Sequence, residues 1–147
     1  MQPDHFTKPT SASGYLAAMT KIIFTSGINW RVVDAKWEGI KEAFADFDIG
    51  KVAEMTPADV DRLAEDPRII RNRRKIEAII DNAGRIAELD TAYGGFEKYL
   101  ASLGGYEKKA AALKRDFSFI GDSTAYFFLA MVGEQVPDWE EHSHKVS

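Results

Sequence analysis

One stretch of the sequence decides the fold: Asn72-Arg73-Arg74-Lys75-Ile76-Glu77-Ala78-Ile79-Ile80-Asp81-Asn82-Ala83. Its apolar residues recur every three or four positions and continue to Ile86, which predicts one long amphipathic helix from about Asn72 to Leu89. Asp66-Pro67 ends the helix before it, because proline disfavours helical backbone in the residue that precedes it. The whole pattern is typical of a helix with one apolar face.

Helical spacing also extends outward on both sides of this stretch. Asn29 and Thr56 are expected to cap two of the other helices, and Gly94-Gly95 and Gly104-Gly105 to separate the later ones. The expected helices cover residues 12–26, 30–47, 57–65, 72–89, 96–103, 106–115 and 123–132. No segment alternates in the way of a strand, so we expect an all-α fold, a single-domain helical bundle over residues 12–140. A loosely ordered segment, 1–11, and a flexible tail, 141–147, are expected to flank it.

Composition limits the class of protein. A chain of 147 residues that is 45% hydrophobic can bury one sizeable core. No apolar run approaches the roughly 20 residues of a membrane span, and Met1-Gln2-Pro3-Asp4-His5 lacks the features of a signal peptide. We therefore expect a cytoplasmic monomer without membrane contact. The absence of cysteine excludes disulfides, and we expect no metal site and no cofactor.

Positive charge is concentrated within residues 68–75 of a chain whose net charge is -4. Arg74 and Lys75 lie three and four positions after Arg71, and the three side chains are expected to share one exposed helical face. Such a face at a helix start, where free backbone N–H groups add positive potential, can bind a phosphate. The alternative is a solvated face whose charge is balanced by nearby acidic residues.

A second candidate for DNA binding is the turn Phe117-Ser118-Phe119-Ile120-Gly121, which leads into a helix through Asp122-Ser123-Thr124. Two helices joined by a glycine hairpin can direct several backbone N–H groups at one phosphate without reading any base. Gly121 and Ser123 are the residues expected to make this contact. The alternative is an ordinary turn between helices.

Three further side chains are candidates for binding or chemistry. Trp30 and Tyr126 could stack on an extruded base, although each could equally belong to the core. Asp138 follows the last helix, and its loop could direct the carboxylate into a cleft as a catalytic group. An exposed aspartate in a polar tail explains Asp138 equally well.

These segments together resemble DNA-3-methyladenine glycosylase I, a family of bacterial repair enzymes within the helix-hairpin-helix glycosylase superfamily. The resemblance lies in Ser26-Gly27-Ile28-Asn29-Trp30, above all in residues 69–83, and again in Phe117-Ser118-Phe119-Ile120-Gly121. It implies a DNA repair enzyme that flips alkylated bases such as 3-methyladenine out of double-stranded DNA and hydrolyses their glycosidic bond. By carry-over, Trp30 matches a tryptophan of the family's base pocket, Gly121 matches the hairpin glycine, and Asp138 falls near the superfamily's catalytic aspartate.

Two departures from the family pattern accompany the resemblance. The family's pocket glutamate falls at Ile22, so no carboxylate is available there to accept hydrogen bonds from a methylated adenine. If the first helix is shifted by one turn, Thr20 or Thr25 would line the pocket instead. The zinc-binding elements near both chain ends of the family are also missing, which implies that helix packing alone closes this fold.

Three functions are consistent with this pattern. The first is a divergent N-glycosylase, because an alkylated purine is already a good leaving group and needs no strong acid. The second is a non-catalytic DNA-binding module in which Ile22 fills the former pocket, and a cavity near Trp30 that admits a purine would distinguish the two. The third is a protein-interaction scaffold, for which DNA binding would be weak or insensitive to salt.

Overall fold

The computed structural model describes residues 8–140 and residue 142, and it contains helices and no strand in that part of the chain. The α-helices are α1 (Ala12–Thr25), α2 (Trp30–Ala43), α3 (Ile49–Ala53), α4 (Pro57–Leu63), α5 (Arg73–Tyr93), α6 (Phe96–Leu103), α7 (Tyr106–Asp116) and α8 (Asp122–Met131), and a short 3-10 helix η1 (Ala45–Phe47) lies between α2 and α3. The expected all-α fold is confirmed. None of the helices in the described part is both long and apolar enough to cross a membrane.

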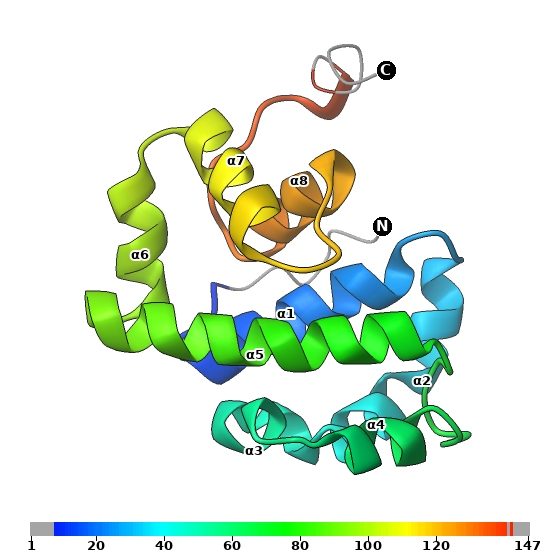
Figure 1. Ribbon diagram of the computed structural model, residues 1–147. Coiled ribbons are helices and arrows are strands. Elements are labelled where there is room, and N and C mark those ends of the chain that lie inside the picture. Colours follow the sequence, from blue (N-terminus) through cyan, green and yellow to red (C-terminus); the bar gives the residue numbers. More distant parts are fainter. Residues whose placement is uncertain (1–7, 141, 143–147) are drawn as a thin grey trace.

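Helix α5 is the centre of the arrangement (Figure 1). It packs along α1 and also contacts α3, α4 and α6. In Figure 1, α3 and α4 lie below this central pair, α2 runs downward at its right-hand end, and α7 and α8 lie above it. The fold therefore has a lower and an upper group of helices with α1 and α5 between them.

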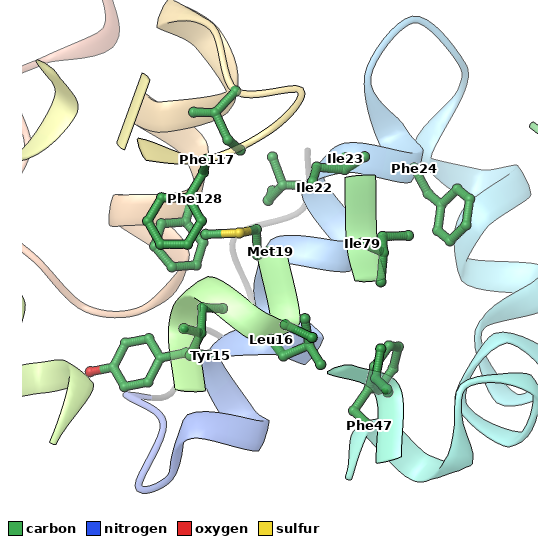
Figure 2. Packing of buried hydrophobic residues seen from close by; sticks show 14 of the residues in the cluster. Tyr15, Leu16, Met19, Ile22, Ile23, Phe24, Phe47, Ile79, Phe117 and Phe128 are labelled. Atoms are coloured by element: carbon green, nitrogen blue, oxygen red, sulfur yellow. The ribbon is translucent and has the colours of Figure 1, made fainter. Parts of the chain in front are cut away.

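The hydrophobic core is built on the apolar faces of these two central helices. Leu16, Met19 and Ile23 of α1 are fully buried, as are Ile76 and Ile79 of α5. Figure 2 shows the α1 side chains and Ile79 within this core. The apolar stripe expected along residues 76–86 is therefore the face of α5 that packs inward.

Local sequence signals set most helix starts. Asn29 accepts a hydrogen bond from the N–H of Arg31 at 2.8 Å, as expected for the cap of α2. Thr56 and Asp59 form a reciprocal capping box at the start of α4. Asn72 caps α5, so the helix begins one residue later than expected and continues to Tyr93.

Helix α2 ends earlier than the sequence predicts. The expected helix reaches Phe47, but α2 stops at Ala43, and residues 45–47 have left-handed backbone with φ of 55°, 55° and 57°. Such backbone costs about 1–2 kcal/mol per non-glycine residue. The turn places the ring of Phe47 against Trp37, with centroids 5.4 Å apart, and against Phe44 at 5.9 Å. Aromatic packing that the local sequence does not reveal offsets the strain here.

A buried amide attaches the α7–α8 hairpin to α5. Asn82 is 1% exposed. Its Nδ2 donates to the carbonyl oxygen of Ser118 at 3.0 Å, and its Oδ1 accepts from the Ser118 N–H at 2.8 Å. One side chain therefore satisfies both backbone groups of a residue within the hairpin turn.

A buried cation attaches the end of α1 to the start of α5. Lys75 is 5% exposed, and its Nζ donates to the carbonyl oxygens of Phe24 at 3.2 Å and Ser26 at 2.6 Å. Burial lowers the pKa of the Lys75 ammonium below its usual value. The same Nζ lies 5.9 Å from the ring centroid of Phe119 in the hairpin turn. The expectation that Lys75 shares an exposed face with Arg74 is wrong, because its ammonium turns inward to carbonyls that end α1.

The Asn82 bonds can be tested by Asn82→Leu. We expect the free energy of unfolding to fall by about 2–4 kcal/mol, because the Ser118 N–H and carbonyl lose their partners in a buried position. Urea unfolding followed by circular dichroism measures the change. Asp81→Leu, on the exposed neighbouring position, is the matched control and should change stability by about 0.5 kcal/mol or less. Equal effects of the two substitutions would show that Asn82 does not hold the hairpin.

The inward position of Lys75 can be tested with Lys75→Met beside Arg74→Met. Lys75→Met should lower the free energy of unfolding by about 1–3 kcal/mol, since the Phe24 carbonyl loses its buried donor. Arg74→Met should stay within about 0.5 kcal/mol of the parent, because Arg74 is exposed. The opposite ranking in thermal and urea unfolding would place Lys75 on the surface after all.

Candidate active site

A cavity of about 280 Å³ lies where the end of α1 meets the start of α8. For comparison, a cavity of about 150 Å³ is enough to bind benzene. Its lining comes from α1, from the loop between α1 and α2, and from the first two turns of α8: Ile22, Thr25, Ser26, Gly27, Ser123, Thr124 and Phe127. Two segments about one hundred positions apart in the chain therefore form its opposite walls.

The cavity wall is uncharged. Ile22 and Phe127 supply apolar surface, and the polar side chains among the described lining residues are the hydroxyl residues Thr25, Ser26, Ser123 and Thr124. The Thr25 hydroxyl donates to the carbonyl oxygen of Lys21 at 2.7 Å. Such a wall can enclose an aromatic ring and hydrogen-bond to its edge without presenting a charge.

The position of Ile22 answers a question left open by the sequence. Ile22 is 2% exposed and lines the cavity without filling it. Figure 2 shows it at the edge of the core on the side of Phe117. Of the two threonines considered as alternatives, Thr25 lines the cavity, whereas Thr20 is fully buried elsewhere in α1.

Trp30 begins α2 immediately after the loop that lines the cavity. It is partly exposed, and the guanidinium carbon of Arg31 lies 5.6 Å from its ring centroid. Trp30 is not among the residues that line the cavity. Its expected role in stacking on a base stays a prediction.

The hairpin between α7 and α8 opens next to the cavity. The φ of Gly121 is -111°, and a Cβ at this position would meet only the Thr124 hydroxyl at 3.9 Å. Neither backbone strain nor internal crowding therefore requires a glycine, and the backbone at Gly121 is open to close approach from outside the hairpin. In the described part of the chain, the backbone N–H groups of Asp122, Ser123 and Thr124 have no side-chain cap.

The basic face that the sequence predicts at the start of α5 is only partly present in the structure. Arg71 lies before the Asn72 cap and Arg74 lies in the first turn of α5; both are exposed, and neither forms an ion pair with a described residue. By contrast, Arg73 forms an ion pair with Asp61 at 2.7 Å. The unpaired arginines therefore lie at the end of α5 from which Lys75 reaches the cavity loop.

Two exposed residues close in sequence to the cavity loop were not identified from the sequence. Arg31, like Arg71, has no ion pair with the described residues, and Ile28 is 40% exposed beside Gly27, whose φ is +81°. The local sequence does not indicate that this isoleucine is exposed. Its significance depends on the fold, since it directly follows Gly27, which lines the cavity.

Tyr126 lies in a different environment from the one expected. It is 7% exposed, its hydroxyl donates to the carbonyl oxygen of Pro137 at 2.7 Å, and its ring stacks on His142 with centroids 4.8 Å apart. Trp139 lies 4.9 Å from the same ring. Because these contacts occupy the ring, Tyr126 packs the C-terminal turn against α8 and is not available at the cavity.

Asp138 is exposed and begins the same C-terminal turn. Its Oδ1 accepts from the N–H of Glu140 at 2.9 Å, and its carbonyl oxygen accepts from the N–H of His142 at 2.9 Å. Asp138 does not line the cavity, although Trp139 beside it packs on Phe127 at 4.9 Å, and Phe127 does. The predicted catalytic role of Asp138 is untested by this arrangement.

Comparison with known proteins finds relatives that all belong to one family. The family model for methyladenine glycosylase matches residues 16–114. The DNA-3-methyladenine glycosylase of Haemophilus influenzae is 31% identical over 129 residues, covering 74% of this chain and 70% of the relative. DNA-3-methyladenine glycosylase 1 of Escherichia coli K12 is 30% identical, with 74% and 69% covered.

Solved structures agree with the sequence relatives. The 3-methyladenine DNA glycosylase I of Staphylococcus aureus, solved to explain its recognition of 3-methyladenine, superposes with a TM-score of 0.78 at 29% identity. That comparison covers 89% of this chain and 82% of the other. A family model that spans more than half of the chain, together with these relatives, settles the assignment: the chain belongs to the methyladenine glycosylase family.

Proposed function

We propose that this protein is a DNA N-glycosylase that removes alkylated bases such as 3-methyladenine by flipping them into the cavity between α1 and α8. The observation that carries the proposal is an uncharged cavity of about 280 Å³ next to the helix hairpin. The start of α5 adds exposed arginines, Arg71 and Arg74, that form no ion pair with a described residue. Family membership adds the reaction, since the relatives are glycosylases by name. The proposed substrate is double-stranded DNA, and the proposed form is a cytoplasmic monomer.

The hairpin and the start of α5 would hold the DNA backbone. The uncapped N–H groups at the start of α8, around Ser123, suit a phosphate, and Gly121 lets the phosphate approach. Arg71 and Arg74 would contact a second part of the backbone, because no internal acid from the described residues neutralises them. These contacts read no base, as a protein that inspects all sequences requires.

The loop between α1 and α2 would help to extrude the base. Ile28 is an exposed apolar side chain next to Gly27 in this loop, and such side chains can insert between base steps when a duplex is bent. Trp30 would then offer its partly exposed ring to the flipped nucleotide. The energy of unstacking is lowest for a damaged base, which itself favours lesions.

The proposed reaction requires no acidic group in the cavity. A 3-alkylated purine nucleotide carries a positive charge, so the base leaves with the electron pair of the glycosidic bond as a neutral molecule. A water then supplies its oxygen to the anomeric carbon and releases a proton to solvent. The sugar cation would be stabilised by a neighbouring phosphate or by Asp138. An uncharged wall is therefore compatible with catalysis that depends on positioning.

The direct test of the proposal is release of free base from methylated duplex DNA by the purified protein. Wild-type protein should release 3-methyladenine, and Ser123→Trp should reduce the rate by about 100-fold or more, because the indole occupies the cavity from an exposed position and the base is misplaced. Ser123→Ala is the matched control and should retain release. If the wild type releases no base yet binds DNA with strong salt dependence, the chain is a non-catalytic DNA-binding module.

The proposed backbone contacts can be tested by salt titration of binding to undamaged duplex DNA. Removing one phosphate contact lowers the slope of log affinity against log salt by about 1. We expect this change for Arg71→Ala and for Arg74→Ala, measured by fluorescence anisotropy. Arg62→Ala is the control, because Arg62 already pairs with Asp59 at 2.7 Å. Equal slopes for all four proteins would remove the start of α5 from the DNA interface.

A further inference from the structure

The hairpin turn between α7 and α8 carries one aromatic side chain that the fold does not bury. Phe119 is 41% exposed, whereas Phe117 and Ile120 in the same turn are 7% and 8% exposed and belong to the core. The backbone of Ser118, next to Phe119, is held by the side chain of Asn82. The neighbours of Phe119 therefore anchor the turn, and the ring of Phe119 is left outside the core.

The backbone of Phe119 is also strained. Its φ is +66°, in the left-handed region that glycine and asparagine adopt more easily than a phenylalanine does. At residues 45–47 the same strain is offset by aromatic packing, but the ring of Phe119 has no aromatic neighbour among the described residues. The Nζ of Lys75 lies 5.9 Å from the Phe119 ring centroid, close to the roughly 6 Å limit of a cation–π contact. Strain that internal contacts offset so little is typical of ligand sites.

Lys75 brings this ring close to the cavity loop. The same Nζ that lies under the ring donates to the carbonyl oxygen of Ser26 at 2.6 Å, and Ser26 lines the cavity. Two residues after Phe119, Gly121 precedes the uncapped N–H groups that are proposed to bind a phosphate. An exposed phenyl ring therefore accompanies both the cavity loop and the proposed phosphate site.

An exposed phenyl ring suits DNA from which one nucleotide has been flipped. When a base leaves the stack, the bases next to it expose their flat faces to water. An aromatic side chain that stacks on such a face strengthens binding by about 5- to 150-fold for each base. The arginines at the start of α5 cannot supply this contact, because they would bind the charged backbone and not the bases.

We propose that Phe119 contacts DNA by packing against a base that becomes exposed when the damaged nucleotide is flipped. The hairpin then recognises the opened duplex through this ring as well as the DNA backbone through its N–H groups. The inference rests on the proposed glycosylase function and adds a DNA-contact residue to it. Because Phe119 is not among the residues that line the cavity, its ring affects the binding of opened DNA and not the binding of the free base.

The test compares binding of two duplexes by fluorescence anisotropy, one undamaged and one with a tetrahydrofuran abasic-site analogue. Phe119→Asn should weaken binding of the tetrahydrofuran duplex by about 5- to 150-fold and affect the undamaged duplex much less. The slope of log affinity against log salt should not change, because no phosphate contact is removed. Phe119→Tyr keeps the ring and should bind as the wild type does. Tyr93→Asn, which removes a 46% exposed ring at the other end of α5, is the matched control and should have no effect.

A structural role for the ring predicts different results. Phe119→Asn should unfold at a urea concentration close to that of the wild type, because asparagine tolerates left-handed backbone and this offsets the lost ring contacts. Binding of free 3-methyladenine, followed by nuclear magnetic resonance, should also be unchanged. An unfolding midpoint as low as that of Asn82→Leu, or equal losses for the free base and the tetrahydrofuran duplex, would overturn the inference.

The remaining outcomes separate this inference from the proposed function. If the wild type releases 3-methyladenine but Phe119→Asn binds the tetrahydrofuran duplex as tightly as the wild type does, the inference fails and the proposed function stands. If the wild type releases no base from methylated duplex DNA, both fail.

Discussion

The attachment of both cavity walls to α5 is the constraint on which the rest of the site depends. Lys75 binds the carbonyl oxygens of Phe24 and Ser26 at the end of α1, and Asn82 binds the backbone of Ser118 in the hairpin. Both side chains are buried, which limits the competition of water for these four hydrogen bonds. The spacing between the loop after α1 and the start of α8 is set by one rigid helix. A cavity between segments far apart in the chain can therefore keep a defined width.

This arrangement explains how an uncharged site can serve a glycosylase. An alkylated purine is a good leaving group, so positioning can supply what a strong acid would supply for a normal base. The C-terminal turn is held by ring packing, in which Tyr126, Trp139 and His142 lie within 5.5 Å of one another by ring centroids. Because Trp139 also packs on Phe127, this cluster supports one wall of the cavity from behind. Side-chain packing thus fixes the described end of the chain against α8.

The parts of the fold that local chemistry controls could be predicted from the sequence. Caps such as Asn29 and Thr56 act through their own neighbours in the chain, so the helix starts followed from residue type and order. The left-handed turn at residues 45–47 could not be predicted, because it depends on Phe47 packing against Trp37. The clustering of positive charge also led to a wrong prediction, that Lys75 is exposed. Lys75 has the same local pattern as Arg74, but its ammonium turns inward to carbonyls that lie 49 and 51 positions earlier in the chain. Of the residues that line the cavity, the sequence analysis had singled out Ile22 at the position of the family's pocket glutamate, Thr25 as its alternative and Ser123 beside the hairpin.

The central claim is that the base occupies the cavity between α1 and α8, and its location can be measured by nuclear magnetic resonance. Free 3-methyladenine would be titrated into the labelled protein while backbone amide resonances are followed. The account predicts saturable shifts centred on Ser26, Gly27, Ser123 and Thr124. Shifts centred instead on the larger cavity of about 680 Å³ at the start of α7, which Tyr106 and His142 line, would contradict it.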